Sequence, residues 1–472
     1  MKKRIKIISL LISVITLSST LVVFASTELE KQDVKIIGNT VIRKSQTIEN
    51  KEFNSTIDFE NSILVQKCKV TLKNPTIKKS GGKNNDVSKM FGVNSGILVT
   101  DKSSLNLIGG KIETDGEQAN ALYCYQDSNV IAKESSIKTL KPNSNGLMIN
   151  GDGKISGTNL DVKTLGSFSS AIMTIGNDGN IILNKGNYTT SGISSPVINT
   201  SSNVEVSNAL LKASRSGAIE LVNKGSISLN KVVLESYDLT PSRNYVHKNI
   251  FIYQEGEKNL EQSTFKAKKT TITTNQGSVF FVTNANTKID LIENTFDTKT
   301  KDFLKILSDK YGNKDNNGGT VSLNMRKQKV TGDITVDKLS TLSMDLSDNS
   351  FYRGVINKNN KANNISITLD SDSKIVLDDD SYISSLINED NENSNIYLNG
   401  HKLFVNGNEV TANDKYIEKK SDKNNKKEDS SYFSNIIKTI ISILKVTGVL
   451  LIVILVIMFF VYLNNRKHNK MF

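Results

Sequence analysis

Cysteine and histidine are scarce in this chain, which has two cysteines and three histidines in 472 residues. His247, His401 and His468 lie far apart, so no pair has the spacing of zinc ligands. Cys68 and Cys124 are a little over two of the repeats described below apart, about 10 Å along their stacking axis, whereas a disulfide requires Cα atoms within about 7 Å. We therefore expect two free, largely buried thiols, and we expect no cofactor.

Positive charge is also missing from most of the chain. The formal net charge is +12, but the excess lies near the two ends, and residues 26–413 are almost neutral. Arginines there are isolated, and no run of lysine or arginine alternates with aromatic residues. Because nucleic-acid binding requires such a basic surface, we expect no nucleic-acid partner.

What the sequence does contain is a repeat of 25 residues. Apolar residues open successive units at Ile97, Leu122, Leu147, Ile172 and Val197. A polar turn, a short alternating stretch and a third apolar position follow each opening, usually with Thr or Ser two residues later. Three such period-2 segments separated by Gly, Asn, Asp and Ser turns are typical of one rung of a parallel β-solenoid. The positions predicted to point inward include Leu105, Leu107, Ile112, Val130, Ala132, Ile137, Ile155, Val162, Ile181, Leu183 and Tyr188.

A single rung is too small to be stable. It buries perhaps six apolar side chains at about 1.5–3 kcal/mol each, whereas ordering 25 residues costs roughly 1–2 kcal/mol per residue. Stacked rungs share hydrogen bonds and a continuous core, and parallel crossovers are right-handed. We predict an all-β fold, a right-handed parallel β-helix of about 15 rungs that would form a rod of roughly 70 Å.

Both ends of the chain carry targeting signals. The N-terminus has the basic, apolar and small-residue regions of a signal peptide, with an uncleaved anchor as the alternative. An uncharged stretch near the C-terminus is long enough to span a bilayer, and the basic residues after it predict a cytoplasmic end. The predicted order is a signal peptide (1–25), the extracellular β-helix (26–413), a polar linker (414–432), an amphipathic segment at the membrane interface or extending the span (433–445), a transmembrane helix (446–463) and a cytoplasmic basic tail (464–472).

The later repeats resemble a known superfamily. The stretch from Gly332-Asp333-Ile334 through Leu346 to Gly354 looks like the rungs of autotransporter passenger domains. Over about residues 60–410 the chain is similar to the right-handed parallel β-helix superfamily, which also includes pectate lyases, polygalacturonases and tail-spike proteins. It differs from the passengers in its predicted C-terminal helix and in having no tryptophan. The Lys-, Asn- and Ile-rich composition and helical anchor resemble a surface protein of a low-GC Gram-positive bacterium.

The resemblance includes enzymes, but their site residues have no counterpart here. The superfamily's enzymes carry clustered Asp for calcium with an Arg base, or three Asp with a Gly-His-Gly, and neither pattern occurs. The carboxylates of Asp378, Asp379 and Asp380 are weak candidates for metal binding or acid–base chemistry, with a solvated turn as the alternative. We expect a non-enzymatic, adhesin-like or structural protein that contacts glycans, cell wall or other cells. A polysaccharide lyase or glycoside hydrolase is the alternative.

Two repeat units are longer than the others, and insertions in solenoids cluster at turns of one face. The first unit holds Tyr237, Arg243, Tyr245 and His247, whose aromatic faces and forked donors suit a sugar or a peptide. We predict a ligand-binding loop there, with a passive insertion as the alternative. The second unit contains apolar residues that predict one short helix lying on the rod, namely Phe303, Leu304, Ile306 and Leu307.

Overall fold

A computed structural model describes residues 35–83, 85–238, 246–257 and 261–417. The chain divides into two compact units, Met1–Tyr416 and Ile417–Phe472. The predicted signal peptide, amphipathic segment, transmembrane helix and basic tail lie outside the described residues. Within the described ranges, no helix has both the length and the apolar character needed to cross a bilayer.

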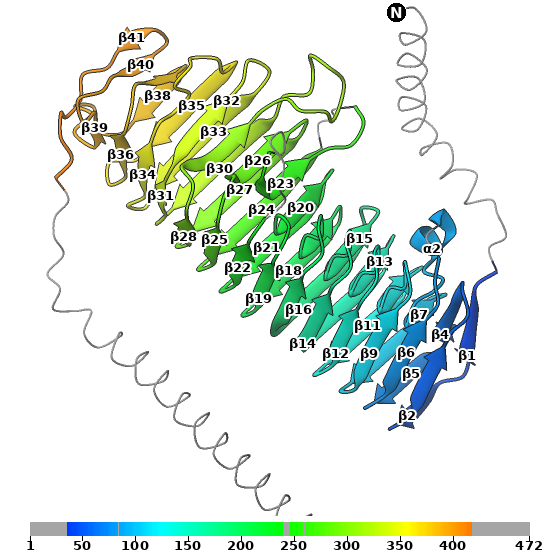
Figure 1. Cartoon of the computed structure of the whole chain (residues 1–472). Coiled ribbons are helices and arrows are strands. Elements are labelled where there is room, and N and C mark those ends of the chain that lie inside the picture. Colours follow the sequence, from blue (N-terminus) through cyan, green and yellow to red (C-terminus); the bar gives the residue numbers. More distant parts are fainter. Residues whose placement is uncertain (1–34, 84, 239–245, 258–260, 418–472) are drawn as a thin grey trace, which may run out of the picture. The chain divides into compact units, whose positions relative to one another are not determined.

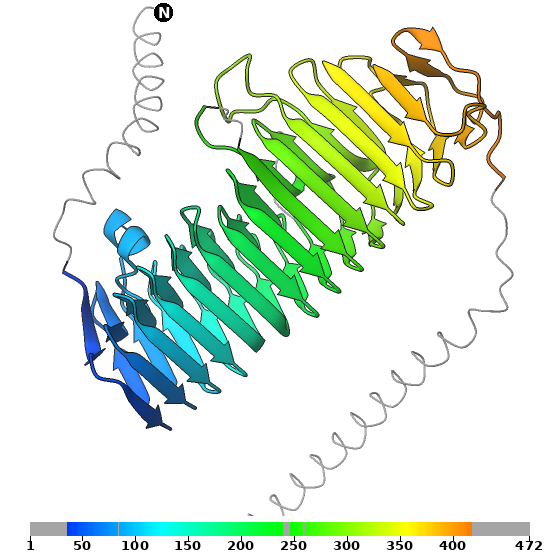
Figure 2. The same cartoon turned by 180° about the vertical axis from the view of Figure 1, so that it is seen from behind.

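The described part of the first unit is a parallel β-solenoid of the right-handed type with about 14 turns (Figure 1). Strands follow one another around each turn, and each pairs with its counterpart in the next turn (Figure 2). This architecture confirms the predicted all-β solenoid. Among the described residues the only helix is α2 (Asp86–Phe91).

One face of the solenoid is a sheet of twelve parallel strands. Every pairing in it joins one turn to the next, so the sheet runs along the stacking direction. Its strands are β1 (Ile37–Ile42), β4 (Glu60–Gln66), β7 (Ile97–Thr100), β10 (Leu122–Tyr125), β13 (Leu147–Asn150), β15 (Ile172–Ile175), β17 (Ile198–Thr200), β20 (Ile219–Val222), β23 (Lys248–Tyr253), β26 (Ser278–Thr283), β29 (Asp302–Ile306) and β32 (Asp333–Val336).

The other faces belong to a sheet of 22 strands, which is continuous because two long strands pass through both strand positions of their turns. The strands at the first position are β2 (Gln46–Glu49), β5 (Lys69–Lys73), β8 (Ser104–Ile108), β11 (Asn129–Lys133), β14 (Lys154–Thr164), β16 (Asn180–Thr190), β18 (Asn203–Ser207), β21 (Ser226–Asn230), β24 (Gln262–Lys268), β27 (Asn286–Ile292), β30 (Thr320–Arg326), β33 (Thr341–Ser347), β35 (Asn364–Leu369) and β38 (Ser385–Asn388). Those at the second are the ends of β14 and β16 with β3 (Glu52–Ser55), β6 (Thr76–Ser80), β9 (Lys111–Asp115), β12 (Ser136–Thr139), β19 (Leu210–Ala213), β22 (Val233–Ser236), β25 (Thr271–Thr274) and β28 (Thr295–Thr298).

Two smaller sheets complete the C-terminal turns. One has four strands and continues the stack; the other has three and includes an antiparallel pair. Their strands are β31 (Lys329–Thr331), β34 (Phe351–Gly354), β36 (Lys374–Leu377) and β39 (Ile396–Tyr397), and β37 (Ser381–Ile383), β40 (Leu403–Val405) and β41 (Asn408–Glu409). Because an antiparallel pair interrupts the parallel stacking, β40 and β41 end the solenoid.

The strand register confirms the 25-residue repeat and corrects one of its boundaries. Leu147 pairs with Ile172, a step of 25 residues. The next partner of Ile172 is Ile198 and not Val197, so this turn contains one more residue than predicted. The extra residue lies in the turn before the strand, where a solenoid tolerates insertions.

The interior is one continuous apolar core, and every inward position predicted from the alternating pattern lies in it. The threonines two residues after the third apolar position are buried and close the turn that follows. Each hydroxyl donates a hydrogen bond of 2.5–2.7 Å to the carbonyl oxygen five residues later, as seen at Thr114, Thr139, Thr164 and Thr190. Cys68 and Cys124 are free and buried, as predicted, and burial raises the pKa of Cys124 to about 12.

The helix predicted in the second insertion is wrong, because this segment is strand β29. Leu304 pairs with Phe280 and Ile306 with Val282 in the twelve-stranded sheet. The register of β29 against β32 shifts between Asp302 and Leu304, and both Phe303 and Leu304 are buried. This irregularity places two consecutive apolar residues inside and so produces a spacing that imitates a helix.

Candidate functional site

The twelve-stranded sheet carries a row of side chains on its outer face. In a strand, alternate residues point to opposite faces, so the neighbours of inward residues point outward. Ile219 pairs with Ile250, which places Phe251 outside, whereas the sequence pattern predicted Phe251 at the position that Ile250 occupies. The strand pairings connect the outward residues of successive turns into one row of Leu98, Tyr123, Met148, Met173, Asn199, Glu220, Phe251 and Phe281.

Helix α2 covers the N-terminal part of this row. Leu98, Tyr123 and Met148 form a small buried cluster outside the main core. The Tyr123 hydroxyl donates hydrogen bonds to the carbonyl oxygens of Lys89 (2.9 Å) and Met90 (3.0 Å) at the end of α2. The apolar side chains here are therefore enclosed and stabilise the docked helix.

A loop after β29 covers the C-terminal part of the row. Phe251, Tyr253 and Phe281 form a second outer cluster, against which Leu307 and Tyr311 pack. The Tyr311 ring lies 5.6 Å from the ring of Phe251 and 4.3 Å from that of Tyr253, measured between centroids. These contacts fix the loop above the sheet, in the region where Figure 1 shows the longest loops of the solenoid.

Between the two covers lies a groove of about 760 Å³, which we call the outer groove. Its floor contains the outward side chains of three successive turns, Met173, Asn199 and Glu220. Phe168, which is 61% exposed, is one of the turn residues beside it. The outer groove thus combines apolar, amide and acidic groups in a site that crosses several turns. Its other lining residues include Lys89, Asn143, Ser194, Val246, Lys248, Asp309, Lys310 and Tyr311.

Glu220 is the acidic group on the floor of the outer groove. Asn199 donates a hydrogen bond of 2.8 Å from Nδ2 to Glu220 Oε2. Burial raises the pKa of Glu220 to about 7, although the nearby Lys248 acts in the opposite direction. Near neutral pH this side chain is therefore present both as an acid and as a carboxylate, which a surface glutamate is not.

Lys248 and Asp309 form an ion pair in the wall of the outer groove. The Lys248 ammonium also lies 4.1 Å from the ring centroid of Phe251 and 4.2 Å from that of Phe281. Burial lowers the pKa of Lys248. Burial would raise the pKa of Asp309, but hydrogen bonds from Lys248 and from the backbone N–H of Lys310 outweigh it and hold this pKa below its ordinary value.

The predicted binding loop is only partly within the described residues. Arg243 and Tyr245 lie outside them. The Nδ1 atom of His247 lies 2.9 Å from the carboxylate of Asp238, which is fully buried, and the Tyr237 ring lies 5.1 Å from the Lys212 ammonium. Neither Tyr237 nor His247 lines the outer groove, although Val246 and Lys248, the two neighbours of His247, do.

The predicted acidic cluster forms ion pairs within the protein. Asp378 accepts a hydrogen bond from Arg353 at 3.0 Å, and Asp379 pairs with Lys358. The hydrogen bond from Lys358 is the largest of the effects that lower the pKa of Asp379. These contacts favour the alternative of a surface turn whose charges are neutralised by neighbouring lysine and arginine side chains.

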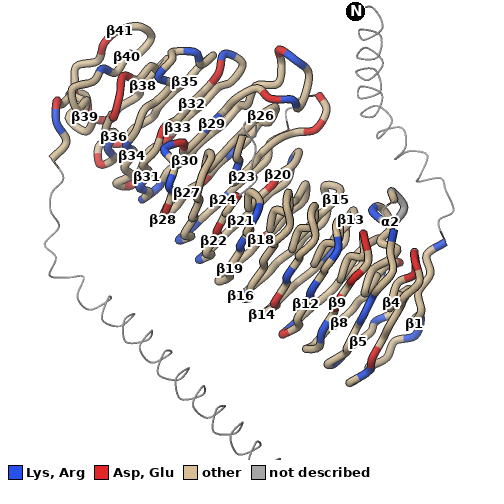
Figure 3. The backbone as a smooth tube through the Cα atoms, viewed as in Figure 1, with Lys and Arg blue, Asp and Glu red and all other residues tan. Residues whose placement is uncertain are grey.

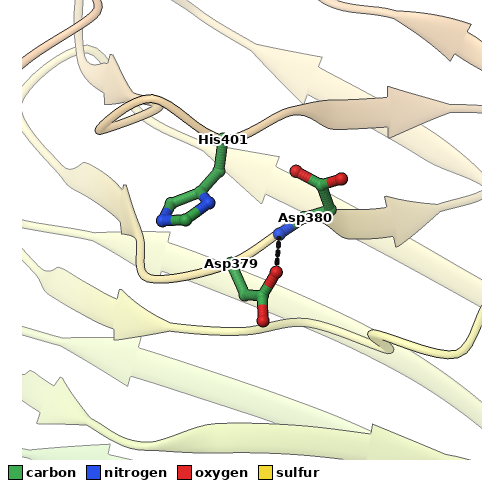
Figure 4. A group of neighbouring side chains, drawn as sticks. All are labelled: Asp379, Asp380 and His401. Atoms are coloured by element: carbon green, nitrogen blue, oxygen red, sulfur yellow. Dashed lines mark hydrogen bonds between the residues drawn. The ribbon is translucent and has the colours of Figure 1, made fainter.

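His401 joins two of these aspartates in the only group with metal-ligand spacing in the described ranges. The ligand atoms of Asp379, Asp380 and His401 lie within 4.8 Å of one another, and Figure 4 shows His401 beside the two aspartates. A cation there would have to displace Lys358 from Asp379. His401 follows Asp379 by about one turn of the solenoid, and only the rung periodicity would have indicated this proximity.

Sequence reasoning missed Glu220, Lys248 and Asp309. One signal was present, since Glu220 is a carboxylate between two apolar residues of a unit opening, Ile219 and Leu221. Comparison with protein-family models, with curated proteins and with solved structures finds no match to this chain.

Proposed function

We propose that this chain is an exported, membrane-anchored surface protein that binds a glycan in the outer groove. Binding is the activity, and the solenoid holds the groove on a rigid sheet. The partner would be a polysaccharide of a cell wall or of another cell. The predicted signal peptide and transmembrane helix, with the large domain outside and the C-terminus in the cytoplasm, support the location. The Gram-positive, adhesin-like character remains part of this proposal.

The observation that carries the proposal is the exposed Phe168 beside a polar groove that crosses several turns. A sugar ring has an apolar face and polar edges, and an aromatic ring with nearby amide and hydroxyl groups complements both. Turns repeat about every 4.8 Å, so a linear polymer would meet a new set of side chains at each turn. A groove of this kind favours an extended ligand over a compact one.

The proposal is tested by screening the full-length protein on a glycan array and measuring the affinity of the best ligand by calorimetry. Phe168→Ala should weaken binding about tenfold, because it removes the exposed ring of the groove. Ile131→Ala is the matched control, since Ile131 is 41% exposed on β11 of the other sheet. The proposal is wrong if no glycan binds, or if both substitutions weaken binding equally.

Cleavage of the polymer is the second candidate, and one observation favours it. Glu220 and Asp309 line the same groove, and their pKa values are displaced in opposite directions. Glycoside hydrolysis uses such a pair, with one carboxyl group protonated and the other ionised. Release of reducing sugar from the bound glycan, lost in both Glu220→Gln and Asp309→Asn, would establish this activity in place of binding alone.

A further inference from the structure

We propose that Glu220 binds the ammonium group of an amino sugar, so that the glycan of the outer groove is a polymer rich in glucosamine. This inference rests on the proposed function and names the chemistry of its ligand. It follows from three properties of the groove near Glu220: the balance of charge, the position of aromatic rings and the hydrogen bonds that Glu220 leaves unused.

The charge balance near Glu220 leaves one negative charge without a partner. The charged groups that act on Glu220 are Lys248, Glu255 and Lys310, and Lys248 is itself paired with Asp309. With Glu220 ionised, these five side chains carry three negative and two positive charges. No cationic group of the described residues lies within ion-pair distance of the Glu220 carboxylate. A ligand cation would complete the set.

Aromatic rings lie next to the same carboxylate. Phe251 pairs with Glu220 across adjacent strands, and both Phe251 and Tyr311 line the outer groove. The rings of this cluster already accept an ammonium group, because Lys248 lies over Phe251 and Phe281. Carboxylate and aromatic faces together are the groups that recognise an ammonium ion, and partial burial strengthens both contacts.

The hydrogen bonds of Glu220 also favour a donor ligand. Within the described residues, its one hydrogen-bond partner is Asn199, whose amide bonds Oε2. Oε1 is left to accept from a ligand, and an ammonium group offers three donors. A neutral hydroxyl offers one donor and no charge. An amino group therefore gains more from this site than the hydroxyl group it replaces.

Affinity for an ammonium group should depend on pH. The group binds the ionised form of Glu220, whose pKa is about 7. Affinity therefore rises as the pH increases toward 7 and levels off above it, until the amine of the ligand loses its own proton. Tyr253 and Tyr311 also lie near Glu220, but their raised pKa values keep them neutral over this range.

The test compares three oligomers of the same length, built from glucosamine, N-acetylglucosamine and glucose, in calorimetric titrations of the full-length protein at neutral pH. The glucosamine oligomer should bind about tenfold more tightly than the other two, the effect of one charge-assisted contact. Glu220→Gln should abolish this preference and leave the melting temperature no lower. Glu205→Gln, which changes an exposed carboxylate of β18, should preserve it.

The outcomes separate this inference from the proposed function. Equal binding of the three oligomers, weakened in each case by Phe168→Ala, would overturn the ammonium site and keep the glycan groove. Failure of the glucosamine oligomer to bind would overturn the ammonium site, and an empty glycan array would overturn both. Appearance of shorter oligomers during the titration would assign Glu220 to catalysis and contradict a binding role.

Discussion

At the scale of single residues, Glu220 is the group whose environment departs most from that of a surface side chain. It lies in the outer row of the sheet, where Met173 and Asn199 precede it and Phe251 follows. Burial disfavours its charge, and Lys248 compensates only partly because Asp309 holds that ammonium group. The folded protein therefore maintains a carboxyl group that takes up and releases a proton near neutral pH.

The titration of Glu220 should make stability depend on pH. Its pKa is close to 4.5 in an unfolded chain and about 7 in the folded protein. Between these values the folded protein holds a proton that the unfolded chain has released, so the free energy of unfolding falls as the pH rises. The full effect is about 3 kcal/mol. In thermal unfolding scans from pH 4 to 8, Glu220→Gln should remove this decline and exceed the wild-type protein in stability at pH 8. An unchanged pH profile would contradict the assignment.

At the scale of elements, each turn depends on its neighbours for core and hydrogen bonds. The inward residues of one strand lie above those of the next, as Ile155 of β14 lies between Val130 and Ile181. The turns between strands face solvent and carry the polar residues of the repeat. Substitutions at the two kinds of position should therefore differ sharply in effect.

Ile155→Asp and Asp152→Lys test this difference within a few residues of the same turn. Ile155 is buried, and an aspartate there would place a charge in the core without a partner, so soluble expression should be lost. Asp152 is exposed and accepts one hydrogen bond from the backbone of Asp127, so its replacement should cost about 1 kcal/mol or less. Expression yield and chemical denaturation measure the two effects. Equal tolerance at both positions would be incompatible with the inward assignment.

At the scale of the whole molecule, the solenoid presents the outer groove on a long sheet with mixed surface charge. Figure 3 shows lysine, arginine and acidic residues interspersed along the turns. Residues 26–413 are nearly neutral, and the positive charge of the chain lies toward its ends. This distribution is typical of an exported domain followed by a cytoplasmic basic tail, and it favours recognition by local contacts over attraction by net charge.

The predicted topology is tested with a tag at the C-terminus of the full-length protein. Protease added to intact cells without their wall should degrade residues 26–413 and leave the tagged tail protected, because the basic tail should be cytoplasmic. Immunoblots for both parts measure the outcome. Loss of the tag in intact cells would reverse the orientation, and protection of both parts would place the domain inside.

The sequence by itself determined the turn of the solenoid. The inward positions, the polar turns and the free cysteines follow from a period of 2 within a period of 25, and both patterns depend on residues close in the chain. They were therefore visible at Ile155 and Leu183 without any knowledge of the stack. The resemblance to a β-helix added the right architecture, while its adhesin-like part stays a proposal.

Only the tertiary structure decided the outer face. One extra residue before Ile198 and a register irregularity at Phe303 changed which side chains share a row, because a shift of one residue moves a side chain to the opposite face. Glu220 and Asp309 are far apart in sequence and line one groove, as do the helix and the loop that border it. Local patterns predict what each strand buries, but the register of stacked turns and the paths of the long loops determine what the sheet displays.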